Sequence, residues 1–336
     1  MSKSTEKISF SIVVPVYNRP QETAELLSSL LAQSFKDFEV IIVEDGSSVL
    51  SEKVVRNYMN RLQIKYFYKE NSGPGQSRNY GMQRATGNYF IILDSDVVLP
   101  ENYMQIVNNR LQNHYVDAYG GPDAAADNFT NIQKAINYAM TSFFTTGGIR
   151  GKSNSMEKFH PRSFNMGISK EVFTKTGGFS KMRFGEDIDF SIRIMSEGFT
   201  SALFTEAFVY HKRRNTLKQF FKQVYNSGIA RINLYKRHPK SLKVVHFFPA
   251  LFSIGFLVSF FGIFVSKLLL LPFLLYLIIL LFDAYKQYNN LKIALQSAFF
   301  SFVMLLGYGL GFIRAFYKRI IRKEPEFASF EKTFYE

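Results

Sequence analysis

Two aspartates stand two residues apart at the end of an apolar run in the first third of the chain. The stretch is "YFIILDSDVVLP", residues 89–100, and it contains Asp94 and Asp96. Carboxylate oxygens at this spacing can close around one divalent cation, and Mg²⁺ or Mn²⁺ held in this way keeps open positions for phosphate groups. The spacing alone is a weak signal, because Asp187 and Asp189 repeat it. The first pair is distinguished by its place directly after a predicted buried strand.

Polar residues also follow two earlier apolar runs. Asn18 comes after "FSIVVPVY", and Asp45 ends the apolar part of "FEVIIVEDGSS". Each of these residues alone favours a simple turn. In a parallel sheet, however, the carboxyl ends of the strands meet at one edge, where ligands bind. Asn18, Asp45 and Asp94 together therefore predict a site at that edge.

A second acidic group lies in "GGFSKMRFGEDIDFSIRIMSEGF", residues 177–199. Apolar residues with helical spacing follow Gly185, so Glu186 and Asp187 are expected in the first turn of a helix. Acidic residues at this position stabilise the helix dipole, and this structural interpretation competes with a role for one of them as a general base. The residues alone do not decide between the two.

A histidine and a basic run follow the last strand-like segment of the soluble part. His211 precedes Lys212, Arg213 and Arg214 in "FVYHKRRNT". A lone histidine is usually structural, and a basic run often flanks a membrane segment. An imidazole is nonetheless a good ligand for Mn²⁺, and an arginine can hold phosphate oxygens through two parallel hydrogen bonds. The segment is therefore a second candidate for metal and phosphate binding.

The elements that must position these residues alternate along the chain. Apolar runs bounded by turn residues predict strands at residues 10–17, 38–48, 64–70 and 89–96. Segments with helical character lie between them, at residues 20–34, 51–62 and 73–86. Strands that alternate with helices predict a doubly wound α/β sheet.

Composition limits the class of protein. The chain has 336 residues, 47% of them apolar, and no cysteine, so it has a packed core but no disulfide or thiolate metal site. Its formal charge of +14 would suit nucleic acid or an anionic membrane. Much of this charge flanks apolar segments, which favours the membrane and argues against nucleic acid. A dinucleotide-binding oxidoreductase is disfavoured because "GPGQSR" lacks the third glycine of that fingerprint.

Three uncharged apolar segments lie in the last third of the chain, at residues 247–266, 268–282 and 293–313. About 20 such residues at 1.5 Å rise cover a ~30 Å hydrocarbon layer, so these are predicted membrane segments. Basic residues before the first and after the last should both be cytoplasmic, which requires an even number of crossings. We therefore expect a hairpin over residues 247–282 with the last segment re-entrant or interfacial, although three full spans remain an open alternative. Three glycines weaken the last segment as a straight helix: Gly307, Gly309 and Gly311.

A basic stretch precedes the first apolar segment. In residues 216–237, "TLKQFFKQVYNSGIARINLYKR", apolar side chains share one helical face, and Lys218 and Lys222 lie elsewhere. This pattern predicts an interfacial helix with lysines for the headgroups of an anionic membrane. A plain surface helix docked on the soluble domain is the competing interpretation.

Six spaced blocks of the sequence resemble inverting family 2 glycosyltransferases with the GT-A fold. The resemblance runs from about residue 8 to about residue 240, and "FFKQVYNSGIARINLYKRHP" with "GYGLGF" is similar to the membrane-attached subgroup of succinoglycan-type glucosyltransferases. The blocks are "IVVPVYN", "VEDGSS", "GPGQSRNYGMQRATGNYFIILDSD", "FNMGISKEVFTKTGGF", "GEDIDFSIRI" and "YHKRR". The resemblance implies an α/β catalytic domain of GT-A type, a doubly wound, Rossmann-like mixed sheet, with C-terminal membrane helices. The implied divisions are a catalytic domain at 1–210, basic interfacial helices at 211–245, membrane-associated helices at 246–320 and a cytoplasmic tail at 321–336.

The resemblance also implies roles for residues at matching positions. Asp187 would be the catalytic base, with Glu186 as its neighbour facing the acceptor. Asp96 and His211 would hold Mn²⁺ or Mg²⁺ on the diphosphate. The nucleotide sugar would be bound by Pro15, Tyr17, Asn18, Asp45 (toward the base), Arg78, Asp94 (toward the ribose), Ser95 and Arg214, with Arg213 an equal candidate for phosphate. The acceptor side would be shaped by Asn165, Met166 and the turn at Gly177, Gly178 and Phe179.

The implied reaction moves a sugar from a nucleoside diphosphate sugar, with a UDP-sugar favoured, to a lipid-linked saccharide in cell-surface polysaccharide or glycan biosynthesis. The chain has no tryptophan and so lacks the Gln-x-x-Arg-Trp block of processive synthases, which favours single additions. Two alternatives stay open: a polyprenyl phosphate glycosyltransferase, and a non-catalytic nucleotide-sugar sensor or membrane scaffold. The start of the chain does not read as a signal peptide or anchor, so we expect a cytoplasmic catalytic domain at a bacterial-type inner (plasma) membrane.

Overall fold

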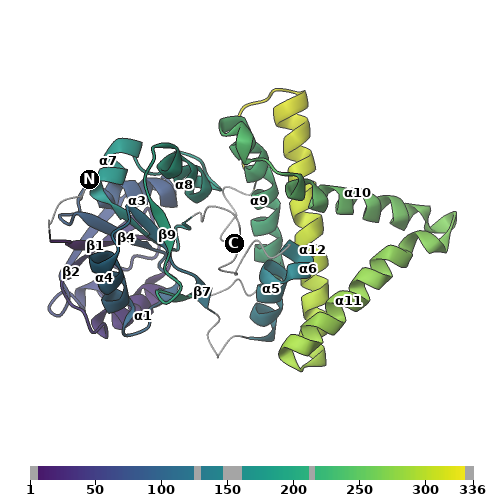
Figure 1. Cartoon of the computed structure of the whole chain (residues 1–336). Coiled ribbons are helices and arrows are strands. Elements are labelled where there is room, and N and C mark those ends of the chain that lie inside the picture. Colours follow the sequence, from purple (N-terminus) through teal and green to yellow (C-terminus); the bar gives the residue numbers. More distant parts are fainter. Residues whose placement is uncertain (1–6, 125–129, 147–160, 212–215, 330–336) are drawn as a thin grey trace. The chain divides into compact units, whose positions relative to one another are not determined.

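The computed structural model describes residues 7–124, 130–146, 161–211 and 216–329. These residues form two compact units (Figure 1). The first unit is made from the described residues before 125 and from 161–211, and the second from 130–146 and 216–329.

The first unit contains two sheets. Its strands are β1 (Phe10–Val16), β2 (Phe38–Asp45), β3 (Ile64–Lys69), β4 (Tyr89–Leu93), β5 (Val97–Val98), β6 (Ala118–Gly120), β7 (Asp123–Ala124), β8 (Asn165–Ser169), β9 (Ser201–Leu203) and β10 (Val209–His211). The larger sheet has the order β3-β2-β1-β4-β8-β6-β9, and the smaller has the order β5-β10-β7. In the larger sheet β8 alone runs antiparallel to its neighbours, so the sheet is mixed.

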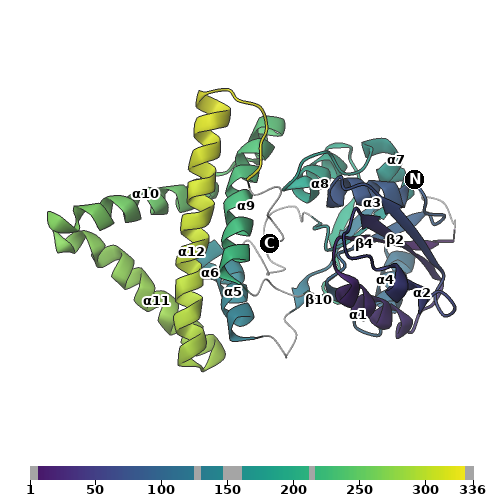
Figure 2. The same ribbon diagram turned by 180° about the vertical axis from the view of Figure 1, so that it is seen from behind.

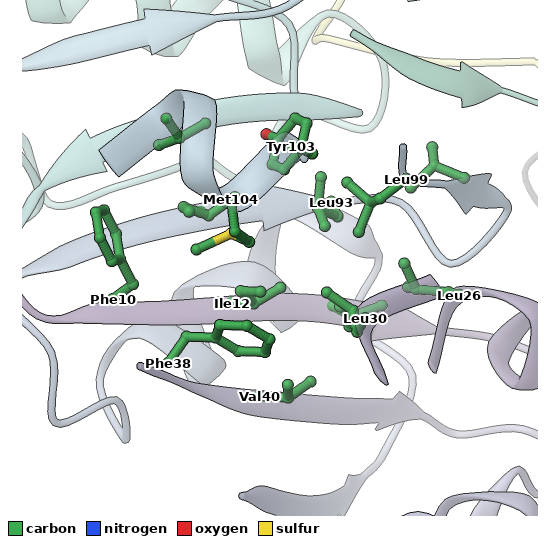
Figure 3. Close-up of a cluster of buried hydrophobic side chains, with 14 of the residues drawn as sticks. Phe10, Ile12, Leu26, Leu30, Phe38, Val40, Leu93, Leu99, Tyr103 and Met104 are labelled. Carbon is green, nitrogen blue, oxygen red and sulfur yellow. The ribbon is translucent and has the colours of Figure 1, made fainter. Parts of the chain in front are cut away.

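Helices cover both faces of the larger sheet, which is why its central strands are apolar on both sides. These helices are α1 (Pro20–Leu31), α2 (Glu52–Arg56), α3 (Pro74–Met82), α4 (Tyr103–Asn113), α7 (Lys170–Thr176) and α8 (Glu186–Ser196). Ile12 of β1 lies in one buried cluster with Leu30 of α1 and Tyr103 of α4 (Figure 3). The next residue, Val13, lies in a second cluster with Phe190 of α8.

The predicted doubly wound α/β fold is confirmed. The four predicted strands become β1 to β4, which pair in parallel, and Pro20 opens α1. The helix predicted at residues 51–62 is shorter, because α2 ends at Arg56 and turns follow it. Asn57 and Asn60 lie in that region, and asparagine has a low helix propensity.

The second unit is helical. Its helices are α5 (Asn131–Thr141), α6 (Phe143–Thr146), α9 (Leu217–Arg237), α10 (Phe248–Phe261), α11 (Leu271–Tyr288) and α12 (Leu291–Phe316), with short turns at Pro239–Ser241, Val244–Phe247, Gly262–Phe264, Lys267–Leu270 and Tyr317–Ile321. Both α5 and α9 pack along α12, and α9 lies beside α12 in both views (Figures 1 and 2). Although α5 lies in sequence between β7 and β8, its Tyr138 packs with Leu280 and Ala294 of this unit.

Glycines allow α12 to approach two neighbouring helices closely. A Cβ atom at Gly311 would lie 2.1 Å from the carbonyl oxygen of Tyr225 in α9, and one at Gly309 would lie 2.2 Å from that of Pro249 in α10. Gly228 of α9 makes the matching close approach to α12. These glycines were expected to weaken a straight helix, yet α12 is continuous through them. Close packing between helices compensates for their low helix propensity.

Within the described residues, three helical stretches are long and apolar enough to cross a membrane, namely Val244–Phe264, Lys267–Tyr288 and Leu291–Ile321. The first two run into one another through a connection that exposes Phe264 at 93% and Val265 at 89% (Figure 1). The third is half covered by other helices of its unit. The three predicted apolar segments are therefore present as helices, and they differ in how much of their surface is exposed.

Candidate active site

The carboxyl ends of three neighbouring strands bring the predicted polar residues to one edge of the sheet. β1 pairs with both β2 and β4, and Asn18, Asp45 and Asp94 lie at or just beyond the ends of these strands. Parallel pairing is sufficient to gather them, because each strand ends on the same side. The edge of the sheet is thus the place where the site is assembled.

Asn18 and Asp45 organise the loops at this edge. Asn18 adopts a left-handed backbone with φ of +54°, and its Oδ1 accepts a hydrogen bond from the Ser48 N–H at 2.8 Å. Asp45 is buried, and it accepts hydrogen bonds from the Gly73 N–H at 2.9 Å and from Lys69 Nζ at 2.5 Å. Both side chains therefore fix the loops at this edge of the sheet.

Strand register brings His211 to Asp96. Asp96 directly precedes β5, and His211 of β10 is opposite Val97 in the antiparallel pair. His211 Nε2 lies 3.3 Å from Asp96 Oδ1, and the imidazole stacks on Phe164 with the ring centroids 5.1 Å apart. Ligand atoms of Asp94, Asp96 and His211 all lie within 4.8 Å of one another. Segments distant in sequence thus form one cluster of two carboxylates and an imidazole.

The cluster suits a divalent cation by its chemistry. Burial acts to raise the pKa of Asp96, but His211 and then Arg19 outweigh burial and hold that pKa well below its usual range. Arg19 pairs through Nη1 with Asp96 Oδ2. Two carboxylates with one imidazole are ligands that fit Mn²⁺, and the carboxylates also fit Mg²⁺.

Arg78 joins the metal-site candidate to the second acidic group. It is 3% exposed, and its guanidinium lies over the Phe179 ring at 5.2 Å from the centroid. Nη2 lies 2.7 Å from Asp94 Oδ1 and Nη1 lies 3.1 Å from Glu186 Oε1. Burial acts to lower the pKa of Arg78, but Asp94 and Glu186 raise it further, so the guanidinium stays charged. Arg78, which was expected to bind the nucleotide, thus pairs with two carboxylates of the protein.

Glu186 and Asp187 occupy the first turn of α8, as predicted, after Gly185 with φ of +83°. Burial and the charge of Asp187 raise the pKa of Glu186 to about 7, although Arg78 opposes this shift. Asp187 is half-buried, and its Oδ2 lies 3.1 Å from Arg162 Nε. The two neighbouring carboxyl groups therefore differ, since Glu186 is tied to Arg78 while Asp187 keeps exposed surface.

Two residues expected at the acceptor side have no exposed surface. Asn165 and Met166 of β8 are 0% exposed. Asn165 Oδ1 accepts a hydrogen bond from the Tyr103 hydroxyl at 2.6 Å, and Asn165 Nδ2 donates to the Ala207 carbonyl at 2.8 Å. Tertiary packing thus places both side chains in the core, and their expected role in shaping the acceptor side stays a prediction.

The other predicted site residues lie near the same edge where the structure describes them. Pro15 and Ser95 are buried, and Tyr17 is half-buried. Gly178 has φ of +74° and lies against α3. Arg213 and Arg214 lie outside the described residues.

Three residues of the site were missed from the sequence. Asn79 of α3 holds the turn before α8, because its Oδ1 accepts from the Phe179 N–H at 2.8 Å and its Nδ2 donates to the Phe179 carbonyl at 2.7 Å. Arg19 pairs with a metal-site carboxylate, and Arg162 pairs with Asp187. Asn79 and Arg19 adjoin residues that were predicted, which was a usable signal. No feature of the sequence pointed to Arg162.

Comparison with known proteins identifies the family of residues 11–177. The profile of glycosyl transferase family 2 matches residues 11–177. An uncharacterized glycosyltransferase of Rickettsia typhi is 38% identical over 124 residues, which are 36% of this chain and 38% of that protein. The poly(ribitol-phosphate) beta-N-acetylglucosaminyltransferase TarS of Staphylococcus aureus is 33% identical over 112 residues, which are 32% of this chain and 20% of TarS. The matched region thus spans less than two fifths of either relative.

Solved structures share the fold over most of the chain. The mannosyltransferase PcManGT from Pyrobaculum calidifontis, in complex with GDP-Man and Mn²⁺, gives a TM-score of 0.62 at 16% identity and covers 89% of this chain and 88% of that chain. TarS residues 1–349 in complex with UDP-GlcNAc give a TM-score of 0.50 at 19% identity, covering 91% and 92%. These neighbours support the expected GT-A-like fold. Through residues 11–177, which hold the sheet edge with Asn18, Asp45, Asp94 and Asp96, this chain belongs to glycosyl transferase family 2.

Proposed function

We propose that this chain is a membrane-bound inverting glycosyltransferase that moves a sugar from a nucleoside diphosphate sugar to a lipid-linked saccharide. The observation that carries the proposal is the convergence of Asp94, Asp96 and His211 within 4.8 Å. Arg78 links this cluster to Glu186, the neighbour of Asp187, at 3.1 Å. One buried arginine thus joins the cluster proposed to bind a cation to the carboxylate next to the proposed general base.

A nucleoside diphosphate sugar is the donor that this site favours. Its diphosphate needs a divalent cation and basic side chains. Asp94, Asp96 and His211 could hold such a cation, and Arg19 is a basic side chain beside them. TarS residues 1–349 were solved with UDP-GlcNAc and PcManGT with GDP-Man, and TarS also shares sequence with this chain. A UDP-sugar remains our preferred donor.

Asp94, Asp96 and His211 would hold Mn²⁺ or Mg²⁺. A cation bound there would stabilise the negative charge that develops on the departing diphosphate. The solved complex of PcManGT contains Mn²⁺, which supports this assignment. The role of the protein is to keep Asp96 ionised and its carboxylate fixed beside His211.

Asp187 would act as the general base. Its carboxylate would take the proton from the acceptor hydroxyl as that oxygen forms a bond to the anomeric carbon. The bond from this carbon to the diphosphate oxygen breaks in the same displacement, and its electron pair leaves with the diphosphate. One such step inverts the anomeric centre. Arg162, 3.1 Å from Asp187, would orient the carboxylate, and the buried Glu186 would be a positioning residue.

The second unit supports a lipid-linked acceptor at a membrane surface. α10 and α11 expose large apolar side chains along their length, which suits a lipid environment. α9 packs closely along α12 through Gly228 and Gly311. α9 also carries cationic side chains that hydrocarbon disfavours, namely Lys218, Lys222, Arg231, Lys236 and Arg237. A hairpin of α10 and α11, with α12 at the membrane interface, is therefore favoured over three full spans. The interface would be the anionic cytoplasmic surface of the inner membrane.

The proposal is tested with the full chain in phosphatidylglycerol-containing liposomes. Release of nucleoside diphosphate from UDP-hexoses and GDP-mannose is followed with Mn²⁺, with Mg²⁺ and with EDTA, in the presence of polyprenyl diphosphate saccharides or polyprenyl phosphate. Asp187→Asn should lower turnover by roughly 100-fold or more. Asp37→Asn, at an exposed acidic residue, is the matched control.

Each outcome separates the alternatives. An extended saccharide product supports the proposal, whereas a lipid monophosphate sugar identifies a polyprenyl phosphate glycosyltransferase. Donor binding without release of nucleotide under any condition would identify a sensor or scaffold. Full turnover in EDTA would remove the proposed role of Asp96, and full turnover of Asp187→Asn would remove the proposed base.

A further inference from the structure

Arg19 is placed where a divalent cation would compete with it. Its Nη1 pairs with Asp96 Oδ2, while His211 Nε2 lies 3.3 Å from Asp96 Oδ1. Both oxygens of Asp96 are therefore engaged by nitrogen atoms of the protein. A cation that takes Asp96 as a ligand competes with these nitrogen atoms for the carboxylate, and a guanidinium cation is repelled by the incoming charge.

Hydrogen bonds fix the backbone on both sides of the Arg19 side chain. The Asn18 N–H donates to Ser47 Oγ at 2.8 Å, and Asn18 Oδ1 accepts from the Val49 N–H at 2.9 Å. The Arg19 carbonyl accepts from the Thr23 N–H at 3.0 Å and from Thr23 Oγ1 at 2.7 Å, within the first turn of α1. The Arg19 guanidinium therefore extends from a fixed backbone beside the cluster of Asp94, Asp96 and His211.

Once displaced from Asp96, the Arg19 guanidinium could pair with the phosphate groups of the donor. Phosphate oxygens of a nucleoside diphosphate would lie against the cation that Asp94, Asp96 and His211 hold. Arginine donates two parallel N–H···O bonds to phosphate oxygens. A carboxylate that is already bound to a cation is a poorer acceptor for such bonds. Arg19 would thus exchange one anion for another without leaving the site.

We propose that Arg19 couples cation binding to nucleotide binding, by pairing with Asp96 before the cation arrives and with the donor diphosphate afterwards. This inference rests on the proposed metal-dependent use of a nucleotide sugar. It makes Arg19 a competitor of the cation when nucleotide is absent and a ligand of the nucleotide when both are present. Because coupling between two ligands is reciprocal, each should raise the affinity for the other.

The test measures binding rather than turnover. Mn²⁺ is titrated into the full chain in detergent, with free Mn²⁺ followed by electron paramagnetic resonance, alone and with saturating UDP or GDP. In the unmodified chain, nucleotide should tighten Mn²⁺ binding by roughly 5-fold or more. Arg19→Gln should bind Mn²⁺ more tightly than the unmodified chain when nucleotide is absent, and nucleotide should then tighten Mn²⁺ binding by clearly less than it does in the unmodified chain. A structural defect alone would not increase affinity.

Two further variants complete the design. Arg19→Lys keeps the positive charge without the planar fork. It should therefore keep the weak Mn²⁺ binding seen without nucleotide and lose part of the coupling. Arg56→Gln removes an exposed arginine that pairs with Glu52 on α2, and it should behave as the unmodified chain does.

The outcomes are distinct. Unchanged or weaker Mn²⁺ binding by Arg19→Gln without nucleotide, or full coupling in Arg19→Lys, would overturn the role of Arg19 while leaving the proposed function intact. If the unmodified chain binds neither Mn²⁺ nor nucleotide, the proposed metal-dependent function fails and this inference fails with it.

Discussion

Arg78 Nη1 lies 3.1 Å from Glu186 Oε1, and this ion pair joins α3 to the first turn of α8 in the interior of the first unit. The other end of the guanidinium holds Asp94 at 2.7 Å. The two halves of the proposed site, one for the donor and one for the acceptor, are therefore connected through a single side chain. Its loss should affect both.

Arg78→Met should destabilise the first unit and reduce turnover together. Removing one member of a buried ionic group leaves the other charges without a counter-ion, which typically costs about 3–5 kcal/mol. We expect a clear fall in the unfolding midpoint of the full chain, measured by circular dichroism. Arg84→Met, at an exposed arginine just after α3, is the matched control and should leave the midpoint nearly unchanged. Equal effects of the two substitutions would contradict a linking role for Arg78.

Glu186 should make stability depend on pH in the range that its shifted pKa defines. Burial and Asp187 raise the pKa of Glu186 from 4.5 to about 7, so the folded protein holds this proton more tightly than the unfolded chain does. Stability therefore falls as pH rises from about 4.5 to about 7. Relative to the unmodified chain, Glu186→Gln should gain up to about 3 kcal/mol across this window. Denaturant unfolding at several pH values measures the difference, and a pH-independent difference would refute the assignment.

Glu39 should act in the opposite direction at the other end of the sheet. Burial tends to raise the pKa of Glu39, but Lys65 at 2.8 Å, Ser11 at 2.6 Å and Thr86 lower it to about 2. A depressed carboxyl pKa stabilises the fold above the unfolded value and loses that contribution as pH falls from about 4.5 to about 2. The advantage of the unmodified chain over Glu39→Gln at neutral pH should shrink across that window. Its persistence at pH 2 would argue against this account.

Close packing of α12 predicts an unusual response to alanine. In a helix, glycine to alanine normally stabilises by about 1 kcal/mol. At Gly311, however, the new Cβ would lie 2.1 Å from a backbone oxygen of α9, so Gly311→Ala should lower the thermal midpoint in detergent. Gly255→Ala in α10 is the control, because its Cβ would meet only an ordinary contact at 3.6 Å. A stable Gly311→Ala would show that α9 and α12 are not packed this closely.

Membrane placement can be measured directly because the chain has no cysteine. Leu291 and Ile321 lie at the two ends of the third apolar stretch and are 64% and 61% exposed. With α12 at the interface, Leu291→Cys and Ile321→Cys should both react with a membrane-impermeant maleimide from the cytoplasmic face of sealed vesicles. Phe264→Cys, at the tip of the hairpin, should be protected from that face. Labelling of the two end positions from opposite faces would establish a full span instead.

Local pattern determined much of this protein. The apolar runs ending in Asn18, Asp45 and Asp94 predicted both the parallel strands and the edge where they meet, because strand period and turn chemistry are properties of neighbouring residues. The position of Glu186 and Asp187 at a helix start was predictable for the same reason. So were three apolar helices, since length and hydropathy are read directly from the chain.

Only tertiary structure decided how these parts are used. Antiparallel pairing of β10 with β5 carries His211 to Asp96, and burial turns Arg78 into a link between carboxylates and Asn165 into core. The glycines of α12 are sites of helix packing because two particular backbones pass there. Such relationships join residues far apart in the chain, and their energies arise from burial and close approach, which exist only after the chain has folded.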